Sequence, residues 1–244
     1  NIITKELIDR TIQEGLKEQD AIIALIASII NLNKEEIEFY LKEGLKELDY
    51  DEYITNPYYQ NIKIPNKKMN NIELGYSSYK PYEVFVQDDF IKKDVRMIPQ
   101  LGYFKEEYKY PCIKENDNIW MLITPNEINT MKDPINHAKG KVLTFGLGLG
   151  YFSYMVSNKE EVESVTIIEN NKDVIELFKK EILPQFPNKD KIHIIEADAY
   201  KYKVEGYDYV FIDIYHDVSD GIDTYIYFKL REEKNITYDY WIEK

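Results

Sequence analysis

Three of the chain's ten glycines, Gly146, Gly148 and Gly150, stand close together and alternate with other residues. They follow the apolar run 142–145 and precede a segment with helical spacing. In the first turn of a doubly wound sheet, glycine lets the backbone bend tightly and approach a ligand closely. Tyr151 stands where the dinucleotide fingerprint requires a small residue, and no P-loop Lys-Ser/Thr pair follows. The segment therefore predicts a ligand-binding loop, but neither a dinucleotide site nor a nucleotide hydrolase.

Three carboxylates end successive predicted strands beyond this loop: Glu169, Asp198 and Asp213. Glu169, with its neighbour Asn170, is placed to accept hydrogen bonds from ribose hydroxyl groups. Asp198 and Ala199 are placed at the edge of an adenine ring. For each carboxylate the alternative is a helix cap or a solvated loop residue. Together they predict a site for an adenosine-bearing ligand.

Residues after the fourth predicted strand are candidates to face a second substrate. Asp213, Tyr215 and His216 are the predicted catalytic residues, with His216 as a candidate general base; its alternative is a surface-loop histidine. His137 and His193 are interpreted as structural. No histidine pair has metal-ligand spacing and Cys112 is the single cysteine, so no metal site is predicted.

The elements that must position these residues alternate along the second half of the chain. Thr124-Pro125-Asn126-Glu127 is typical of a helix start, and that helix is expected to run to about residue 137. The later apolar runs are those of strands buried on both faces. This alternation predicts an α/β fold with a doubly wound, Rossmann-like, mostly parallel sheet. The expected strands are 141–146, 164–169, 192–196, 207–213 and 236–242, and the expected helices are about 150–158, 171–183 and about 220–232.

The first half of the chain predicts two further parts. Residues 1–50 form a helical module, in which Asn33 and Glu36 make a capping pair. Residues 51–123 form a connector, without clear periodicity over 51–80, and a small β segment whose last two runs are joined by the loop 115–118. The Rossmann-like domain is assigned to 124–244.

The ordered motifs resemble those of class I S-adenosylmethionine-dependent methyltransferases, and within that superfamily the spermidine synthase-like branch. The resemblance covers about 120–244 and is carried by 142–150, Ile168-Glu169, Ala197-Asp198-Ala199 and 208–213, with 124–131 and 180–184 pointing to the branch. It implies that Phe145, Gly146, Gly148 and Gly150 cradle the methionyl part of S-adenosylmethionine or of its decarboxylated form. The sequence offers only five strands for the sheet, so the superfamily's last strands are expected to be missing.

Departures from the branch lie at three positions. Thr144 stands where most of the superfamily has an acidic residue, Leu149 replaces an Asp of the spermidine synthase loop, and His216 replaces the second Asp of its Asp-x-x-Asp motif. The prediction is therefore a methyltransferase acting on an unknown small-molecule acceptor. The alternatives are an aminopropyltransferase that uses decarboxylated S-adenosylmethionine and a non-catalytic adenosyl-ligand-binding protein.

Composition limits the partners. The net charge is −13, and each of the segments 1–50, 51–140 and 141–244 is net acidic, so nucleic acid is not expected, whereas a cationic acceptor is compatible with the charge. The longest apolar run, 21–30, is too short to span a bilayer, and no membrane partner is expected. The single cysteine fits a cytoplasmic setting. A homodimer is left open.

Overall fold

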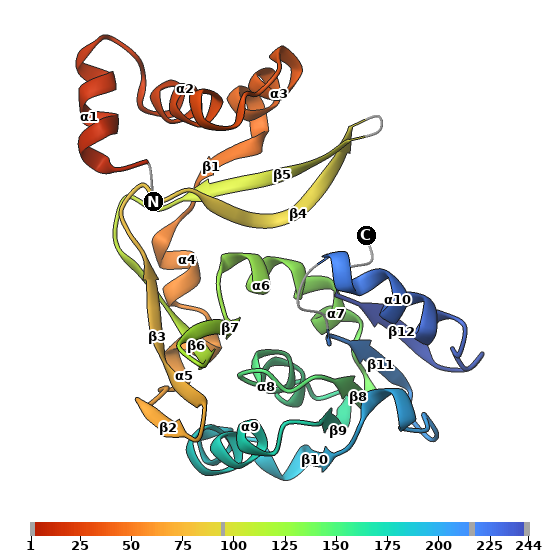
Figure 1. The fold of residues 1–244 in the computed structure, drawn as a ribbon. Helices are drawn as coiled ribbons and strands as arrows, with labels where there is room; N and C mark the ends of the chain where they lie inside the picture. The colour runs from red at the N-terminus through yellow and green to blue at the C-terminus, as the bar shows by residue number, and fades with distance from the viewer. Residues whose placement is uncertain (1–2, 94–95, 215–217, 242–244) are drawn as a thin grey trace. The chain divides into compact units, whose positions relative to one another are not determined.

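The computed structural model describes residues 3–93, 96–214 and 218–241, and within them the backbone forms two compact units (Figure 1). The first unit comprises 1–54, 77–110 and 124–129, and the second comprises 55–76, 111–123 and 130–244. Tyr215 and His216 lie outside the described residues.

Helices and a three-stranded sheet make up the first unit. Helix α3 begins with a complete capping box, because Asn33 accepts from the Glu36 N–H while Glu36 accepts from the Asn33 N–H. The helix ends in a π-helical turn, Tyr40–Gly44, that leads directly into β1. The sheet has the order β1-β5-β4, parallel between β1 and β5 and antiparallel between β5 and β4. Its elements are α1 (Lys5–Gln13), α2 (Glu18–Ile30), α3 (Lys34–Phe39), β1 (Leu45–Glu47), α4 (Tyr50–Ile54), β4 (Phe85–Lys93) and β5 (Arg96–Tyr103).

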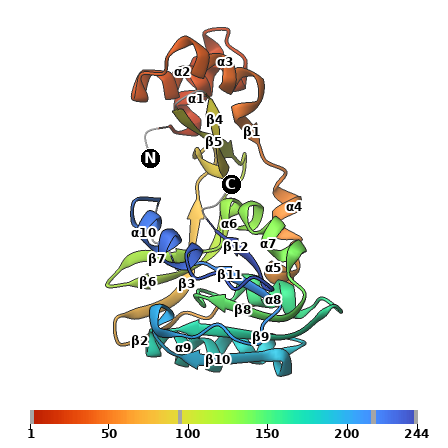
Figure 2. The same ribbon diagram turned by 90° about the vertical axis from the view of Figure 1, so that its right-hand side faces the viewer.

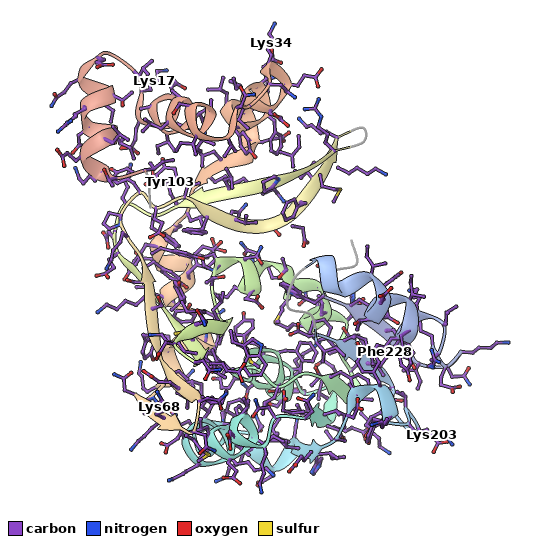
Figure 3. The ribbon with its side chains drawn as sticks, in the orientation of Figure 1. Lys17, Lys34, Lys68, Tyr103, Lys203 and Phe228 are labelled. Carbon is purple, nitrogen blue, oxygen red and sulfur yellow. The ribbon has the colours of Figure 1, made fainter. Side chains whose placement is uncertain are left out.

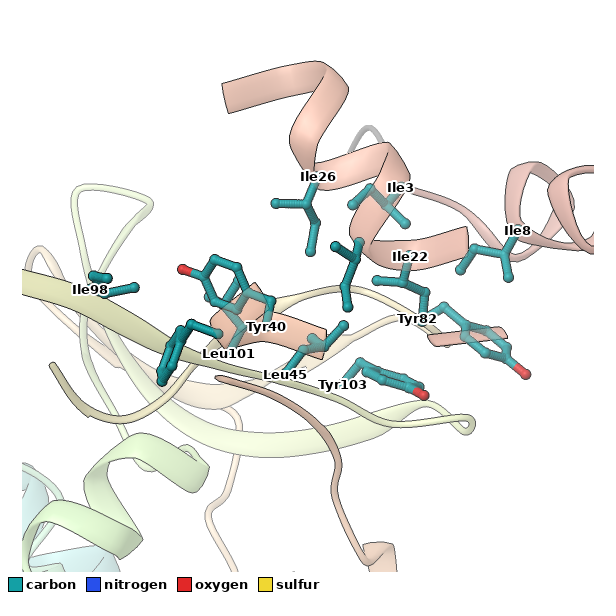
Figure 4. Close-up of a cluster of buried hydrophobic side chains, with 12 residues drawn as sticks. Ile3, Ile8, Ile22, Ile26, Tyr40, Leu45, Tyr82, Ile98, Leu101 and Tyr103 are labelled. Atoms are coloured by element: carbon teal, nitrogen blue, oxygen red, sulfur yellow. The ribbon is translucent and has the colours of Figure 1, made fainter. Parts of the chain in front are cut away.

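Apolar side chains from these helices and strands share one core (Figure 4). Ile8 and Ile22 from the helices are fully buried in the same cluster as Leu45, Leu101 and Tyr103 from the strands. Burial of this size dominates the stability of a small unit. Residues 3–44 therefore pack onto the three-stranded sheet. The sequence pattern predicted the helices but not their packing on this sheet.

The segment 51–80, expected as a connector, is mostly regular structure. It holds α4 and three further elements, and two of its tyrosines are core residues: Tyr53 and Tyr58 are 4% and 0% exposed. A four-stranded sheet has the order β2-β3-β6-β7, and the expected 115–118 turn joins β6 to β7 with positive φ at Asn116 and Asp117. The elements are α5 (Pro57–Asn61), β2 (Lys67–Met69), β3 (Ile72–Tyr79), β6 (Tyr108–Glu115) and β7 (Asn118–Leu122).

The second unit is built on a five-stranded parallel sheet in the order β10-β9-β8-β11-β12, which Figure 2 shows from bottom to top. The chain starts at the central strand, moves outward through β9 and β10, and then returns to the other side for β11 and β12. The predicted parallel sheet is thereby confirmed. Its elements are β8 (Gly140–Phe145), α8 (Tyr151–Ser157), β9 (Val162–Glu169), α9 (Lys172–Leu177), β10 (Ile192–Glu196), β11 (Tyr209–Ile212), α10 (Val218–Lys229) and β12 (Thr237–Tyr240).

Both faces of this sheet carry helices (Figure 1). On one face Phe145 packs against Phe228 of α10, labelled in Figure 3, with 5.0 Å between ring centroids. On the other face Phe211 packs against Phe152 of α8, with 4.4 Å between ring centroids. The sheet is therefore wound on both sides, which explains why its strands read as continuous apolar runs.

The single helix expected over 124–137 is two short helices, α6 (Pro125–Thr130) and α7 (Lys132–His137). Pro134 has no N–H for the Thr130 carbonyl, and it stands in the first turn of α7, where an N–H has no helical partner. The proline thus favours a new helix start over continuation. Among the described residues, no helix has the length and apolar character needed to cross a membrane.

Candidate functional site

The glycine loop, residues 146–150, leaves the carboxyl end of the central strand β8. All three glycines have positive φ: 98° at Gly146, 50° at Gly148 and 77° at Gly150. A Cβ at Gly146 would overlap the backbone oxygen of Asp213, and one at Gly150 would overlap the ring of Phe178. Two of the glycines are therefore required by the protein's own packing.

Gly148 differs from the other two in its packing. Among the described residues, a Cβ built there would meet a single near atom, the Met121 sulfur of β7, at an ordinary contact distance of 3.7 Å. No contact among these residues requires glycine, so the local reason for it is the positive φ of 50°. Glycine at such a turn also permits a ligand to approach the backbone closely.

Hydrogen bonds fix most of the loop's backbone. The Gly146 N–H donates to the Ile168 carbonyl at 2.9 Å, and the Gly150 N–H donates to the Leu147 carbonyl at 2.9 Å. The Leu147 N–H donates to the Glu169 carboxylate at 3.2 Å. Within the described part of the chain, the N–H groups of Gly148 and Leu149 have no acceptor. Two backbone donors at and beside Gly148 are thus available to a ligand.

Glu169 is at the carboxyl end of β9, as predicted, and is 7% exposed. Its carboxylate accepts from Leu147 and also from the N–H groups of Asn170 (2.9 Å) and Asn171 (2.8 Å). Asn170 itself is exposed. The sequence did not indicate that this carboxylate joins the β9–α9 turn to the glycine loop. The Asn170 and Asn171 N–H groups occupy both acceptor sites of Oε1, so one site is left, on Oε2.

Asp198 and Ala199 follow β10. The Asp198 side chain accepts from the Tyr200 N–H at 3.0 Å and pairs with Lys201 at 3.0 Å. The ion pair with Lys201 and the bond from Tyr200 hold the pKa of Asp198 below its usual range. Ala199 starts a short 3₁₀ turn and packs partly buried. Asp198 therefore caps this turn, which was the alternative to a ligand contact, and its contact with adenine stays a prediction.

Asp213 follows β11 directly across from the loop: its N–H donates to the Phe145 carbonyl at 3.0 Å, and its own carbonyl lies against Gly146. β8 and β11 are the neighbours between which the strand order reverses, and ligands of open α/β sheets bind at such a point. Burial raises the pKa of Asp213 to about 7. Asp213 therefore keeps its proton to a higher pH than an exposed carboxyl group does.

Phe145, predicted to line the loop, is fully buried and its ring packs against Phe228 and Tyr202. Its side chain therefore belongs to the core, and only its backbone borders the loop. Leu149 is also buried, at 3% exposed.

Three residues that the sequence analysis missed, in or next to α5, bind the glycine loop and the helix α8 that follows it. The hydroxyl of Tyr58 in α5 donates to the Leu149 carbonyl at 2.6 Å, and both partners are buried. Asn56 donates to the Tyr151 hydroxyl at 3.0 Å, and Asn61 donates to the Tyr154 hydroxyl at 3.1 Å. Because these partners are about 90 positions apart in sequence, no local pattern could reveal them.

The remaining histidines lie away from the loop. His137 contacts Asp239 at 2.8 Å, and Asp239 also accepts from the buried Tyr209 hydroxyl. His193 is an exposed residue of β10. In the described ranges no three His, Cys, Asp or Glu side chains are grouped so that they could hold a metal ion.

Comparisons with known proteins give partial likenesses. No protein-family model matches the chain, and no curated protein matches it. Among solved structures, a dimethyladenosine transferase from Plasmodium falciparum matches 40% of this chain and 32% of its own at 22% identity, with a TM-score of 0.31. The 23S rRNA methyltransferase ErmE matches 40% and 36%, respectively, at 22% identity and a TM-score of 0.30.

A third solved structure is the glycopeptide N-methyltransferase MtfA complexed with S-adenosyl-L-methionine. It matches 45% of this chain and 50% of its own at 18% identity, with a TM-score of 0.35. The likeness therefore spans from about a third to a half of each of these three proteins.

Proposed function

We propose that the protein is an S-adenosylmethionine-dependent methyltransferase with a small-molecule acceptor. One observation carries the proposal: Gly148 and the half-buried Asp213 flank the point where the strand order of the parallel sheet reverses. Neither the dinucleotide fingerprint nor a P-loop is present at this turn. An adenosyl ligand that carries an amino-acid end is the class that fits the remaining features.

The donor set suits such a ligand. The free N–H groups of Gly148 and Leu149 can bind the carboxylate of a methionyl group. Glu169 lies on the adjacent strand, already bonded to Leu147, and the one acceptor site left on its carboxylate can accept from a ribose hydroxyl. S-adenosylmethionine, when bound, supplies a methyl group on a positively charged sulfur. The protein's role would be to hold the methyl group and the attacking atom of the acceptor in line for the transfer.

Asp213 is the candidate to act on the acceptor. Its pKa of about 7 allows it to take a proton from an attacking group at neutral pH, which is the condition for an efficient general base. An amine acceptor would gain from this and from the acidic charge of the chain. Tyr215 and His216, outside the described residues, remain proposed to face the acceptor.

Methyl transfer is favoured over aminopropyl transfer by the loop itself. Leu149 stands where the spermidine synthase-like branch has an Asp, and its side chain is buried. The loop therefore offers no carboxylate at that position for the amino end of decarboxylated S-adenosylmethionine.

Isothermal titration calorimetry with three compounds tests the proposal: S-adenosylmethionine, S-adenosylhomocysteine and decarboxylated S-adenosylmethionine. We expect the first two to bind and the third to bind more weakly. Transfer of a labelled methyl group to a mixed pool of amine acceptors then separates an enzyme from a binding protein. Preference for the decarboxylated compound would favour aminopropyl transfer, and binding of none of the three would overturn the proposal.

A further inference from the structure

Tyr58 is the buried side chain that reaches the glycine loop from outside the parallel sheet. It belongs to α5 and is 0% exposed, and its hydroxyl donates to the Leu149 carbonyl at 2.6 Å. Burial raises the pKa of Tyr58 well above its usual value, so the hydroxyl remains a donor at every physiological pH. The loop carbonyl is therefore held by a permanent neutral hydrogen bond.

This bond acts on one peptide group from one end while a second bond acts from the other. The peptide between Leu149 and Gly150 has its carbonyl bound by Tyr58 and its N–H bound by the Leu147 carbonyl. Because a peptide group is planar, two bonds at its opposite ends fix its orientation. The Leu147 carbonyl belongs to the Leu147–Gly148 peptide, so its bond from Gly150 also directs the Gly148 N–H away from the inside of the turn. The Leu149 N–H belongs to the Gly148–Leu149 peptide, which lies between the two peptides that these bonds hold.

Helix α5 is itself firmly anchored within the second unit. Asn56 caps it by accepting from the Tyr58 N–H at 2.9 Å while donating to the Tyr151 hydroxyl. The Tyr58 ring makes edge contacts with the rings of Tyr151 and Tyr154, with centroids 5.7 and 5.5 Å apart. Tyr58 therefore couples a packed helix to a loop that consists largely of glycine and would otherwise be free to change shape.

We infer that Tyr58 is a positioning residue that holds the glycine loop in the shape that binds the adenosyl ligand, so that ligand affinity depends on α5. The inference rests on the proposed function. Any buried tyrosine hydroxyl needs a hydrogen-bond partner. Tyr58 is distinguished by its partner, which is a carbonyl of the glycine loop. This coupling is reciprocal: the free energy by which docked α5 strengthens ligand binding equals the free energy by which the bound ligand stabilises the docking of α5.

The test compares two Tyr→Phe variants. Tyr58→Phe removes the bond to Leu149. Tyr209→Phe is the control, because Tyr209 is also fully buried and its hydroxyl lies 2.6 Å from the Asp239 carboxylate and 3.0 Å from the Pro134 carbonyl, at the start of β11 rather than at its loop end. Each variant is titrated with S-adenosylhomocysteine, and the exchange rate of the Gly150 amide is measured by NMR without ligand.

We expect Tyr58→Phe to raise the Kd for S-adenosylhomocysteine by about five- to tenfold, the effect of one net hydrogen bond. We also expect faster exchange of the Gly150 amide. Tyr209→Phe should leave both quantities near the wild-type values even where its thermal unfolding temperature falls as far. A folded Tyr58→Phe with the wild-type Kd would overturn the inference.

Failure of the proposed function has a different signature. If the wild-type protein binds no adenosyl compound, the proposed function is wrong. Unchanged exchange of the Gly150 amide in Tyr58→Phe would show, independently of any ligand, that Tyr58 does not position the loop. If Tyr58→Phe does not fold, Asn56→Ala replaces it as the test variant. This substitution removes the cap of α5 without changing any residue of the glycine loop. The same loss of affinity is expected there, and wild-type affinity would count against the inference.

Discussion

Glu169 shows how one side chain can serve both the fold and a ligand. Its carboxylate is nearly buried and binds three backbone N–H groups, one from the glycine loop and two from its own turn. A buried charge is tolerated only when it is satisfied in this way. The residue that the sequence assigned to a ribose is therefore also a structural clamp.

We predict that Glu169→Ala lowers the free energy of unfolding by about 1–3 kcal/mol, because buried N–H groups lose a charged acceptor. It should also weaken the binding of S-adenosylhomocysteine. Urea unfolding and calorimetry measure the two effects, and Glu163→Ala, an exposed position on the same strand, is the control. Loss of stability with undiminished affinity would remove Glu169 from the ribose site.

Asp213 carries a prediction about pH. Its pKa is raised from 3.8 to about 7 by burial, so between about pH 4 and 7 the folded protein binds a proton that the unfolded chain has released. The contribution of this group to stability is therefore greatest below pH 4 and declines as the pH rises to 7. Asp213→Asn should flatten the dependence of the unfolding free energy on pH in that window.

The same variant should reduce methyl transfer strongly while leaving the affinity for S-adenosylhomocysteine near the wild-type value. In the wild type, kcat/KM should rise with pH through about 7 as the carboxyl ionises. A fully active Asp213→Asn would show that the carboxyl is not the base. A variant with the wild-type pH dependence of stability would show that Asp213 is not the titrating group.

At the scale of elements, the glycine loop divides into glycines required by packing and one, Gly148, that no contact among the described residues requires. We predict that Gly150→Ala lowers the unfolding free energy by about 2–4 kcal/mol, because its methyl group meets Phe178 at a positive φ. Gly148→Ala should cost about 1 kcal/mol, from its backbone conformation alone. Affinity for S-adenosylhomocysteine should fall in Gly148→Ala out of proportion to its stability loss. The reverse order of stabilities would contradict this division.

The parallel sheet could be predicted because its evidence is local. Apolar runs such as 165–168 and 209–212 occupy strands β9 and β11, and the glycine loop follows β8 as expected. The break between α6 and α7 could also have been predicted, since Pro134 favours the start of a new helix. Strand order and the neighbours of Asp213 follow from the fold class.

The rest depends on contacts between distant segments. Tyrosines in 51–80 looked like connector residues because burial of a tyrosine depends on partners far away in sequence, as with Tyr58 and Leu149. The role of Glu169 as a clamp was hidden for the same reason. The pairing of β1 with β5 links residues more than fifty positions apart, so the helical pattern of 1–50 could not indicate the sheet beneath it.

At the scale of the whole molecule, the charge of −13 bears on the choice of acceptor. An acidic protein attracts cations and repels polyanions over distances that salt shortens. If the acceptor is a polyamine, we predict that its KM rises with ionic strength, whereas the KM of an uncharged acceptor does not. Steady-state assays at low and at physiological salt measure this. Equal salt dependence for both would remove the electrostatic argument for a cationic acceptor.

A crystal structure of the protein with S-adenosylhomocysteine tests the central claim most directly. We predict that the ligand lies at the carboxyl ends of β8 and β9, with its amino-acid end on the Gly148 and Leu149 N–H groups and a ribose hydroxyl on Glu169. A ligand bound elsewhere, or a loop that remains empty at saturating ligand, would contradict the account.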